Sequence, residues 1–489
     1  SRRYNYLRVF VTTQAQKSDR ITIVSGHEEN LQYLVGKNVR QIISGALATK
    51  SATHLSEDEL VSLGGALTYE GKFSHGALGF AKLEYFKDGS SSVSFYSFDK
   101  EETRTTMDVL SKFPEERPIV KIDSNLPEKV TEQVLDDSDA YHKTGFYQFL
   151  WGKRYRTYFG KKVTAPTVDL DTLYGGVKVT KEGGGHQSFS LRLEDSDGGE
   201  YAMRSLRKSA MKYLKFKLPG IAYNEDKYRD SWPEELVSDF FASAHPYMQL
   251  VMNPLAKGVG VNHSDNDLYF VPKQETLGDF NKDYGDELYF IERRPSEEQV
   301  NYKGYRRTID KNGKVTDMES TTDMLEKIKE DEEYIVDQRA YVRARVFDML
   351  VGDWDRHQDQ WRWIEYEGER GIKEFMPIPR DRDNIFPRFD GFALKLIKMF
   401  VPNSRRWQTF DEDIDDVNWL NLSGSKLDKV LVTDLGAESW VEEAKYIQKN
   451  LTEQEIEEAF QRLPLEVQDS VSGFIKKSLK ARLKQLDQW

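Results

Sequence analysis

The pattern of apolar positions changes period between residues 338 and 386, which predicts a helix followed by a strand pair. Apolar residues at the start of this stretch recur at i, i+4, i+7 and i+8, the spacing of one buried helical face. They are Val342, Val346, Met349 and Leu350. Two apolar runs, 361–364 and 375–378, then flank the turn-forming segment 367–371 and predict a hairpin. We therefore expect a helix over Gln338–Leu350 that ends beside a hairpin.

Acidic side chains stand on both sides of this hairpin. Asp353, Asp355 and Asp359 precede it, and Asp381 and Asp383 follow it, so the fold of the hairpin would bring the second group back beside the first. Carboxylates held close together repel one another, and such a cluster needs cations. A divalent metal is one source of positive charge, and nearby arginines are the other. These arginines are Arg356, Arg380 and Arg382.

Glycines interrupt a second pair of strands further upstream. They are Gly183, Gly184 and Gly185. An alternating strand over 188–193 follows them, and then a strand over 201–206. A glycine-rich turn between strands lets backbone amides approach phosphates, and the next strand can supply a cation. We expect that cation to be Arg204, with Lys208 as the alternative, and an ordinary hairpin is the competing interpretation.

More elements are predicted around this region. Residues 268–271 and 288–291 alternate as strands, and the second strand runs into Glu292, where a hinge between two lobes would fall. Residues 233–250 predict a helix whose acids are expected to be solvated on one face, and pairing of one of them with Arg204 is the alternative. These acids are Glu234, Glu235 and Asp239.

The end of the chain is predicted to be helical. Residues 392–399 supply one apolar face. Thr452 and Glu455 form a capping box that predicts a helix over 453–463. The last predicted helix, 465–489, has an apolar stripe beside a basic face. We expect it to pack as a lid with its basic face in solvent.

The first 105 residues have an α/β pattern. Short buried strands are predicted over 21–24 and 41–44, and a hairpin is predicted over 79–98. Residues 106–145 are charged and interrupted by prolines, so we expect a connector there.

Composition narrows the class of protein. The chain has 489 residues, a net charge of −12 and no cysteine, with 38% hydrophobic and 12% aromatic residues. It can build full cores over about three domains, and the acidic balance argues against a nucleic-acid partner. The lack of cysteine excludes disulfides, Cys-ligated zinc and a thiol nucleophile. No apolar run is long enough for a transmembrane helix, and we expect any leader to have been removed or to lie outside this sequence.

The acidic loops resemble the catalytic and metal-binding loops of atypical kinases of the HipA, CotH and lipid-kinase type. The resemblance rests on Asp355-Arg356-His357, Gln360 and Asp381. It implies a two-lobed kinase-like domain in which this Asp-Arg-His segment is catalytic and Asp355 sits by the attacking hydroxyl. It also implies Mg²⁺ held by the amide and by the later acids, and ATP held by the upstream part. The implied metal residues are Gln360, Asp381 and Asp383, and the implied nucleotide residues are Gly183, Gly184, Gly185, Arg204, Lys208 and Glu292.

Two of these positions depart from the kinase pattern. Arg204 stands where kinases have lysine, and Gln360 stands where they have asparagine. Arginine is always charged and binds phosphate bidentately, so it does not replace lysine neutrally at a packed site. Both changes raise the alternative of a degenerate kinase.

The string GDWDRHQDQWRW followed by PIPRDRD also resembles a longer bacterial family. Its members join a calcineurin-like metallophosphoesterase to this kinase-like domain, and often to an outer-membrane barrel of the surface-antigen type. Residues 1–105 then resemble the C-terminal part of the phosphoesterase, with His27 and Glu29 in a loop that would carry two metal-ligating histidines. Because one of those histidines is replaced and the rest of the site is not found, we do not expect a phosphoesterase metal in this chain alone. The resemblance implies a periplasmic location at the outer membrane and a barrel or envelope complex as partner.

The resulting expectation is an α+β chain with four parts. They are the end of an α/β calcineurin-like phosphoesterase sandwich over 1–105, a connector over 106–145, a kinase-like N-lobe over 146–294 and a C-lobe over 295–489. Three functions stay open: an ATP- and Mg²⁺-dependent phosphotransferase, an inactive periplasmic scaffold with a buried ionic network, and a metallophosphoesterase whose upstream half is missing.

Overall fold

The computed structural model divides the chain into two compact units. The smaller unit comprises residues 1–119 and 214–231, and the larger unit comprises 120–213 and 232–489. The structure describes residues 11–12, 15, 21–26, 31–36, 39–44, 60–64, 67–76, 78–87, 91–97, 107–111, 121–123, 126–135, 142–184, 187–217, 231–295, 314–368 and 371–489. Among them, no helix is long and apolar enough to cross a membrane.

The smaller unit contains two sheets. The first has the order β1-β3-β2-β5-β4, and the second has the order β6-β7-β8. The strands of the first are β1 Thr22–Ser25, β2 Leu31–Gly36, β3 Val39–Ile43, β4 Leu60–Gly64 and β5 Leu67–His75; those of the second are β6 Gly79–Tyr85, β7 Ser91–Ser97 and β8 Met107–Ser111. Residues of both sheets, including Leu31, Phe73 and Phe95, share one core, so the sheets pack face to face. The predicted strands and hairpin are present, while His27 and Glu29 lie outside the described residues.

The larger unit begins with β9 Lys129–Glu132, α3 Gly145–Trp151, α4 Arg156–Phe159 and β10 Val163–Pro166. Strand β9 pairs with β10, so part of the stretch expected as a connector belongs to a two-stranded sheet.

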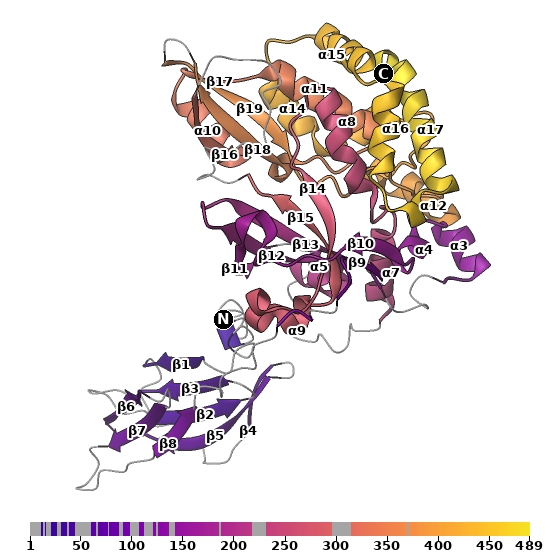
Figure 1. Ribbon diagram of the computed structural model, residues 1–489. Coiled ribbons are helices and arrows are strands. Elements are labelled where there is room, and N and C mark those ends of the chain that lie inside the picture. Colours follow the sequence, from indigo (N-terminus) through magenta and orange to yellow (C-terminus); the bar gives the residue numbers. More distant parts are fainter. Residues whose placement is uncertain are drawn as a thin grey trace. The chain divides into compact units, whose positions relative to one another are not determined.

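A five-stranded antiparallel sheet follows, with the order β11-β12-β13-β15-β14 (Figure 1). Its strands are β11 Val177–Glu182, β12 Ser188–Asp195, β13 Glu200–Lys208, β14 Asn266–Val271 and β15 Glu287–Arg293. Alternation along the strands sends Leu191, Met203 and Ile291 into one core. Arg204 and Glu292 therefore lie on the opposite face.

The helices between β13 and β14 differ from the expectation. They are α5 Ala210–Lys217, α7 Trp232–Phe241 and α8 Met252–Gly258. The single helix predicted over 233–250 is wrong, because α7 ends before Pro246, which disfavours helical backbone at His245. Asp239 of α7 is buried between Arg154 and Arg156 instead of reaching Arg204.

The second sheet of the larger unit carries the predicted hairpin. Its order is β16-β18-β19-β17, with β18 paired antiparallel to β19. The strands are β16 Lys314–Ser320, β17 Tyr334–Val336, β18 Trp361–Glu367 and β19 Lys373–Pro379. Helices α10 Thr321–Glu330 and α11 Gln338–Val351 accompany this sheet. The α11 prediction is confirmed, but the helix is buried from Ala340 to Val351 and not along one face alone.

Helices make up the rest of the chain. They are α12 Phe392–Phe400, α13 Val417–Leu420, α14 Ser425–Leu431, α15 Ala437–Asn450, α16 Glu453–Gln461 and α17 Ser470–Gln485. The capping box predicted at Thr452 and Glu455 is present at the start of α16. Helices α16 and α17 lie side by side (Figure 1).

One core connects the two halves of the larger unit. It includes Leu268 and Phe290 of the first sheet, Trp361 and Phe375 of the second sheet, and Leu479 of α17. Because apolar side chains of both halves pack together, their relative position is fixed within this unit. The expectation of an α+β class is confirmed, while nothing in the fold shows the phosphoesterase part.

Candidate active site

The first acidic loop begins where α11 ends. Gly352 closes the helix in the left-handed conformation, with φ +74°, and donates its N–H to the Asp348 and Met349 carbonyls. Asp348, just inside the helix, is fully buried and accepts from Arg356 Nε at 3.0 Å and from Arg382 Nη2 at 2.9 Å. These arginines therefore neutralise Asp348 and tie the two acidic loops together.

This arrangement changes the expected role of Arg356. The resemblance to atypical kinases implied a catalytic role for Arg356, but its guanidinium is buried and also donates to the carbonyls of Gln360 and Arg380. It does not line the pocket described below. Its contacts are those of a residue that positions the loops.

The second acidic loop follows β19 and is held in an uncommon conformation. Asp381 has φ +55°, a left-handed backbone that Asp and Asn tolerate better than most residues. The side-chain nitrogen of Gln360 donates hydrogen bonds to the Arg380 and Asp381 carbonyls, at 3.1 and 3.2 Å, when the amide is oriented with that nitrogen toward them. Its nitrogen thus ties the two loops through the backbone.

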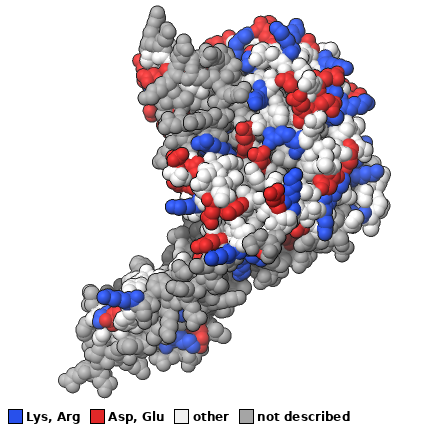
Figure 2. Space-filling model, viewed as in Figure 1, with Lys and Arg blue, Asp and Glu red and all other residues white. Residues whose placement is uncertain are grey.

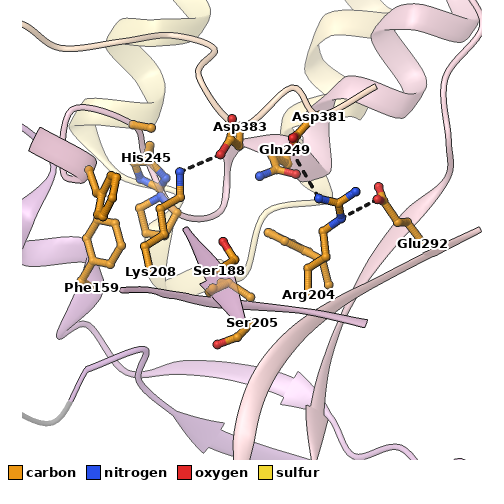
Figure 3. Close-up of a pocket in the computed structure, with 15 residues that line it drawn as sticks. Phe159, Ser188, Arg204, Ser205, Lys208, His245, Gln249, Glu292, Asp381 and Asp383 are labelled. Carbon is orange, nitrogen blue, oxygen red and sulfur yellow. Dashed lines mark hydrogen bonds and ion pairs between the residues drawn. The ribbon is translucent and has the colours of Figure 1, made fainter. Parts of the chain in front are cut away.

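Two cations of β13 face the acids of the second loop (Figure 3). Arg204 Nε donates to Glu292 Oε1 at 2.7 Å, and Arg204 Nη1 lies 3.6 Å from Asp381 Oδ1. Lys208 Nζ lies 2.7 Å from Asp383 Oδ2. The structure therefore brings together both predicted cations, Glu292 and two of the predicted metal-binding acids.

These residues line a pocket between the first sheet and the second acidic loop. It encloses about 580 Å³, including the part open to solvent. Its lining residues are Phe159, Ser188, Arg204, Ser205, Leu206, Lys208, Phe241, Ala244, His245, Pro246, Gln249, Phe290, Glu292, Asp381 and Asp383.

Asp355, like Arg356, does not line this pocket, and its carboxylate has a different environment from those of its neighbours. Its carboxylate has no hydrogen-bond or ion-pair partner among the residues that the structure describes. Burial and the charges of Asp353 and Asp383 raise its pKa to about 7. A carboxylate with a pKa near neutrality is suited to accept and release a proton.

The pKa values of the two acids of the second loop, Asp381 and Asp383, shift in opposite directions. Burial opposes the ionisation of Asp381, but Arg204, Arg380 and Lys208 outweigh it and lower its pKa. Burial and the nearby Asp381 raise the pKa of Asp383, although Lys208 acts against them. One firmly ionised carboxylate thus stands beside one that binds a proton more readily.

The remaining predicted residues lie elsewhere. His357 is 43% exposed at its side chain and caps a short turn by accepting from the Asp359 N–H. Gly183 and Gly184 do not line the pocket, and a side chain at Gly183 would collide with Ser190, so close strand packing accounts for this glycine. Gly185 lies outside the described residues.

A metal site is present only in part. No three His, Cys, Asp or Glu side chains form a metal-binding group within the described ranges. Mg²⁺, however, is commonly held by one or two carboxylates together with substrate phosphates. Asp381 and Asp383 supply that donor set, so the residues fit Mg²⁺ bound with a phosphate ligand.

Among the polar pocket residues that the sequence did not indicate are His245 and Gln249. His245 is buried with no partner at Nε2, and burial lowers its pKa to about 3, so its ring is neutral. Gln249 lies beside it in the lining. Both interrupt the apolar stretch 240–256, and polar residues within such a run were the available signal.

Comparisons with known proteins are sparse. No protein-family model matches the chain, and no curated protein sequence matches it. Among solved structures, it is similar to the proinflammatory kinase CtkA of Helicobacter pylori, at 11% identity over 61% of this chain and 90% of that one, with a TM-score of 0.29. It is also similar to the HipA toxin–antitoxin complex with HipB and operator DNA of Shewanella oneidensis MR-1, at 13% identity over 50% of this chain and 56% of that one, with a TM-score of 0.27. Both TM-scores are low, so neither structure indicates a function for this chain.

Proposed function

We propose that the larger unit is a phosphotransferase that uses ATP and Mg²⁺. The observation that carries the proposal is the unpaired Asp355, whose pKa is raised to about 7 beside the acids of the second loop. The parts follow in the chain order of such enzymes: cations on a strand, then an acid in a loop, then a metal-binding acid after a hairpin. Gln360 also stands five residues after Asp355, the spacing of the catalytic Asp and the metal-binding Asn in kinases.

Each residue then has a chemical role. The oxygen of the acceptor hydroxyl attacks the terminal phosphorus of ATP while Asp355 accepts the hydroxyl proton. The bond from that phosphorus to the bridging oxygen breaks, and ADP leaves. Asp355 afterwards releases the proton to water. Arg204 and Lys208 stabilise the negative charge on the phosphates. Asp381 and Asp383 would hold Mg²⁺, which neutralises charge on the phosphates when bound.

Entry of a metal and ATP requires the ion pairs to rearrange. Lys208 and Arg204 occupy the carboxylates that the metal would use. A phosphate ligand offers these cations a new partner, so Asp381 and Asp383 become available when phosphate and metal bind together. We therefore expect metal and phosphate to bind cooperatively.

The same ion pairs favour a second candidate, a non-catalytic scaffold at the periplasmic side of the outer membrane, bound to a barrel or envelope complex. In it, the pairs across the pocket would serve only to fix the two halves of the unit. The basic face of α17 would be the docking surface in this case, but Lys476 and Lys480 pair with Glu457 and Lys477 pairs with Glu412. Basic and acidic side chains are interspersed over the surface that Figure 2 shows.

A turnover assay separates the two candidates. Full-length protein is incubated with labelled ATP and Mg²⁺, and transfer to protein, to small acceptors and to water is measured. Asp355→Asn should lower the rate about 10²- to 10⁴-fold, the usual contribution of a general base. Asp359→Asn is the matched control, because this residue lies in the same loop with its side chain 77% exposed. No transfer by the folded wild-type protein, or equal rates in Asp355→Asn and wild type, would favour the scaffold.

A further inference from the structure

Arginines line the sheet face at the candidate active site. Arg192 of β12 is opposite Ala202 of β13, and Ala202 is opposite Glu292 of β15. Arg204 lies two residues from Ala202 and therefore on the same face of the sheet. Arg192, Arg204 and Glu292 thus form one polar surface on this face.

Arg380 approaches this surface from the second sheet. It directly follows β19, and its carbonyl is fixed by the Arg356 guanidinium and the Gln360 amide. It lines a second, smaller pocket that shares Gln249, Glu292 and Asp381 with the first. Arg192 lies in the same row of the sheet as Glu292, which lines both pockets, and the space of the two pockets is called the cleft below.

The carboxylates nearby do not neutralise these arginines. Both Glu292 and Asp381 form ion pairs with Arg204. The guanidinium groups of Arg192 and Arg380 have no hydrogen-bond or ion-pair partner within the described part of the chain. Burial and the neighbouring arginines lower the pKa of both to about 10.

The smaller pocket also contains an arginine nitrogen without a hydrogen-bond partner among the described residues. It is lined by Arg382, which is 2% exposed and has no partner at Nη1. A buried charged donor without an acceptor is costly, and an anion in the pocket would remove this cost. Two independent observations, the unpaired arginines across the cleft and the orphaned guanidinium nitrogen, therefore indicate an anionic ligand.

The chemistry of the cleft identifies the class of anion. Guanidinium groups bind phosphate through two parallel hydrogen bonds, and several close together suit a chain of phosphates. A nucleobase, in contrast, is bound mainly by apolar and aromatic surface. The aromatic lining of the first pocket includes Phe241, whose ring centroid lies 5.5 Å from Lys208 Nζ, whereas the row from Arg192 to Glu292 contains one apolar residue, Ala202.

We propose that Arg192, Arg204 and Arg380 form a binding site for a linear chain of phosphates, in which the phosphate groups and not a nucleobase carry the affinity. The chain belongs either to a nucleoside triphosphate or to inorganic polyphosphate. This deepens the proposed function and rests on it for the direction of phosphoryl transfer. The binding itself requires no turnover.

The test is a calorimetric titration of the full chain with three probes in the presence of Mg²⁺. They are inorganic tripolyphosphate, ATP and adenosine. Tripolyphosphate should bind within about threefold of ATP, and adenosine should bind at least 100-fold more weakly than either. ATP binding at least tenfold tighter than tripolyphosphate, or adenosine binding close to ATP, would overturn the proposal.

Variants assign the site to these residues. Arg192→Gln and Arg380→Gln should each weaken tripolyphosphate binding at least tenfold, because each removes a charged double hydrogen bond. Arg339→Gln is the control, since Arg339 is half exposed on α11 and pairs with Glu442. Wild-type affinity in Arg192→Gln and in Arg380→Gln would refute the assignment.

Stability measurements guard against misfolded variants. Without ligand, Arg192→Gln and Arg380→Gln should unfold at temperatures no lower than wild type, because each relieves repulsion between arginines. Tripolyphosphate should then raise the midpoint of wild type and of Arg339→Gln more than that of either cleft variant. Marked destabilisation of both cleft variants without ligand would show that the arginines have structural partners and contradict the proposal.

The two proposals can fail separately. Tripolyphosphate binding that depends on Arg192 and Arg380, without any phosphoryl transfer, would leave the phosphate site in place and remove the proposed enzyme activity. Phosphoryl transfer from ATP, with an affinity for ATP that neither substitution changes, would support the enzyme activity and refute the arginine site.

Discussion

Replacement of Asp355 by Asn should stabilise the protein at alkaline pH. The Asp355 carboxyl is largely buried with no cation paired to it, and its pKa is raised to about 7 from an ordinary value of 3.8. Between these two pH values the folded state binds more protons than the unfolded state, so this group makes stability fall as pH rises from about 4 to about 7. Asn stays neutral throughout and avoids this loss.

The size of the effect follows from the pKa. Each pH unit within the window changes the free energy of unfolding by about 1.4 kcal/mol. From pH 5 to the folded pKa near 7 there are two units, so the advantage of Asp355→Asn over wild type should increase by about 3 kcal/mol between pH 5 and pH 8.

The assay is urea unfolding followed by tryptophan fluorescence at the two pH values. All nine tryptophans lie in the larger unit, so the signal reports on that unit. Asp359→Asn, an exposed change in the same loop, should show no such pH-dependent gain. An equal difference between Asp355→Asn and wild type at pH 5 and pH 8 would refute the account of Asp355, and so would a loss of stability confined to pH 8.

Two further changes test the framework of the site by the same unfolding assay. Asp348→Asn should lower the free energy of unfolding by about 3–5 kcal/mol, because it leaves buried Arg382 without its anion and removes one of the two anions of buried Arg356, and a loss below about 1 kcal/mol would contradict this role. Gly352→Ala should cost about 1–2 kcal/mol, since φ is +74° and a Cβ would lie 3.0 Å from Phe410, whereas Gly473→Ala, near the start of α17 with no atom within 4 Å of the added Cβ, should be neutral or stabilising. Similar effects of the two glycine substitutions would show that the backbone at Gly352 is not under constraint.

Local sequence patterns predicted much of the secondary structure around the site. The hairpin β18–β19 followed from two apolar runs with a charged, glycine-containing turn, and α11 followed from its helical period. Because the hairpin is antiparallel, it returns Asp381 and Asp383 to Asp355, as expected from the sequence. The acids of both loops act on one another electrostatically.

Partners distant in the sequence were less predictable. An acid of the helix after β13 was one candidate partner of Arg204, but Arg204 binds Glu292, which is 88 residues away in the chain. Asp239 is instead buried by Arg154 and Arg156. A charge pattern shows which residues need a partner, but only the packing of α7 and β15 determines which partner lies within reach.

Burial also decided roles that the motif left ambiguous. Within the Asp355-Arg356-His357 segment, the structure leaves the Asp carboxylate unpaired, buries the arginine against Asp348 and leaves the histidine half exposed. Arg192 gave no sequence signal, because a charged residue in an alternating strand is usually solvated. Its significance comes from its place in the row that leads to Glu292, which lines the smaller pocket together with Arg380.

The central claim is a metal-dependent phosphate site at Asp381, and calorimetric titration of the full chain with ATP, with and without Mg²⁺, tests it most directly. Asp381→Asn is the variant to compare, since Asn tolerates the left-handed backbone at this position. We predict saturable binding that requires Mg²⁺ in the wild-type protein and is lost in Asp381→Asn. Absence of binding in a folded wild-type sample, or Mg²⁺-dependent binding unchanged in Asp381→Asn, would contradict the account.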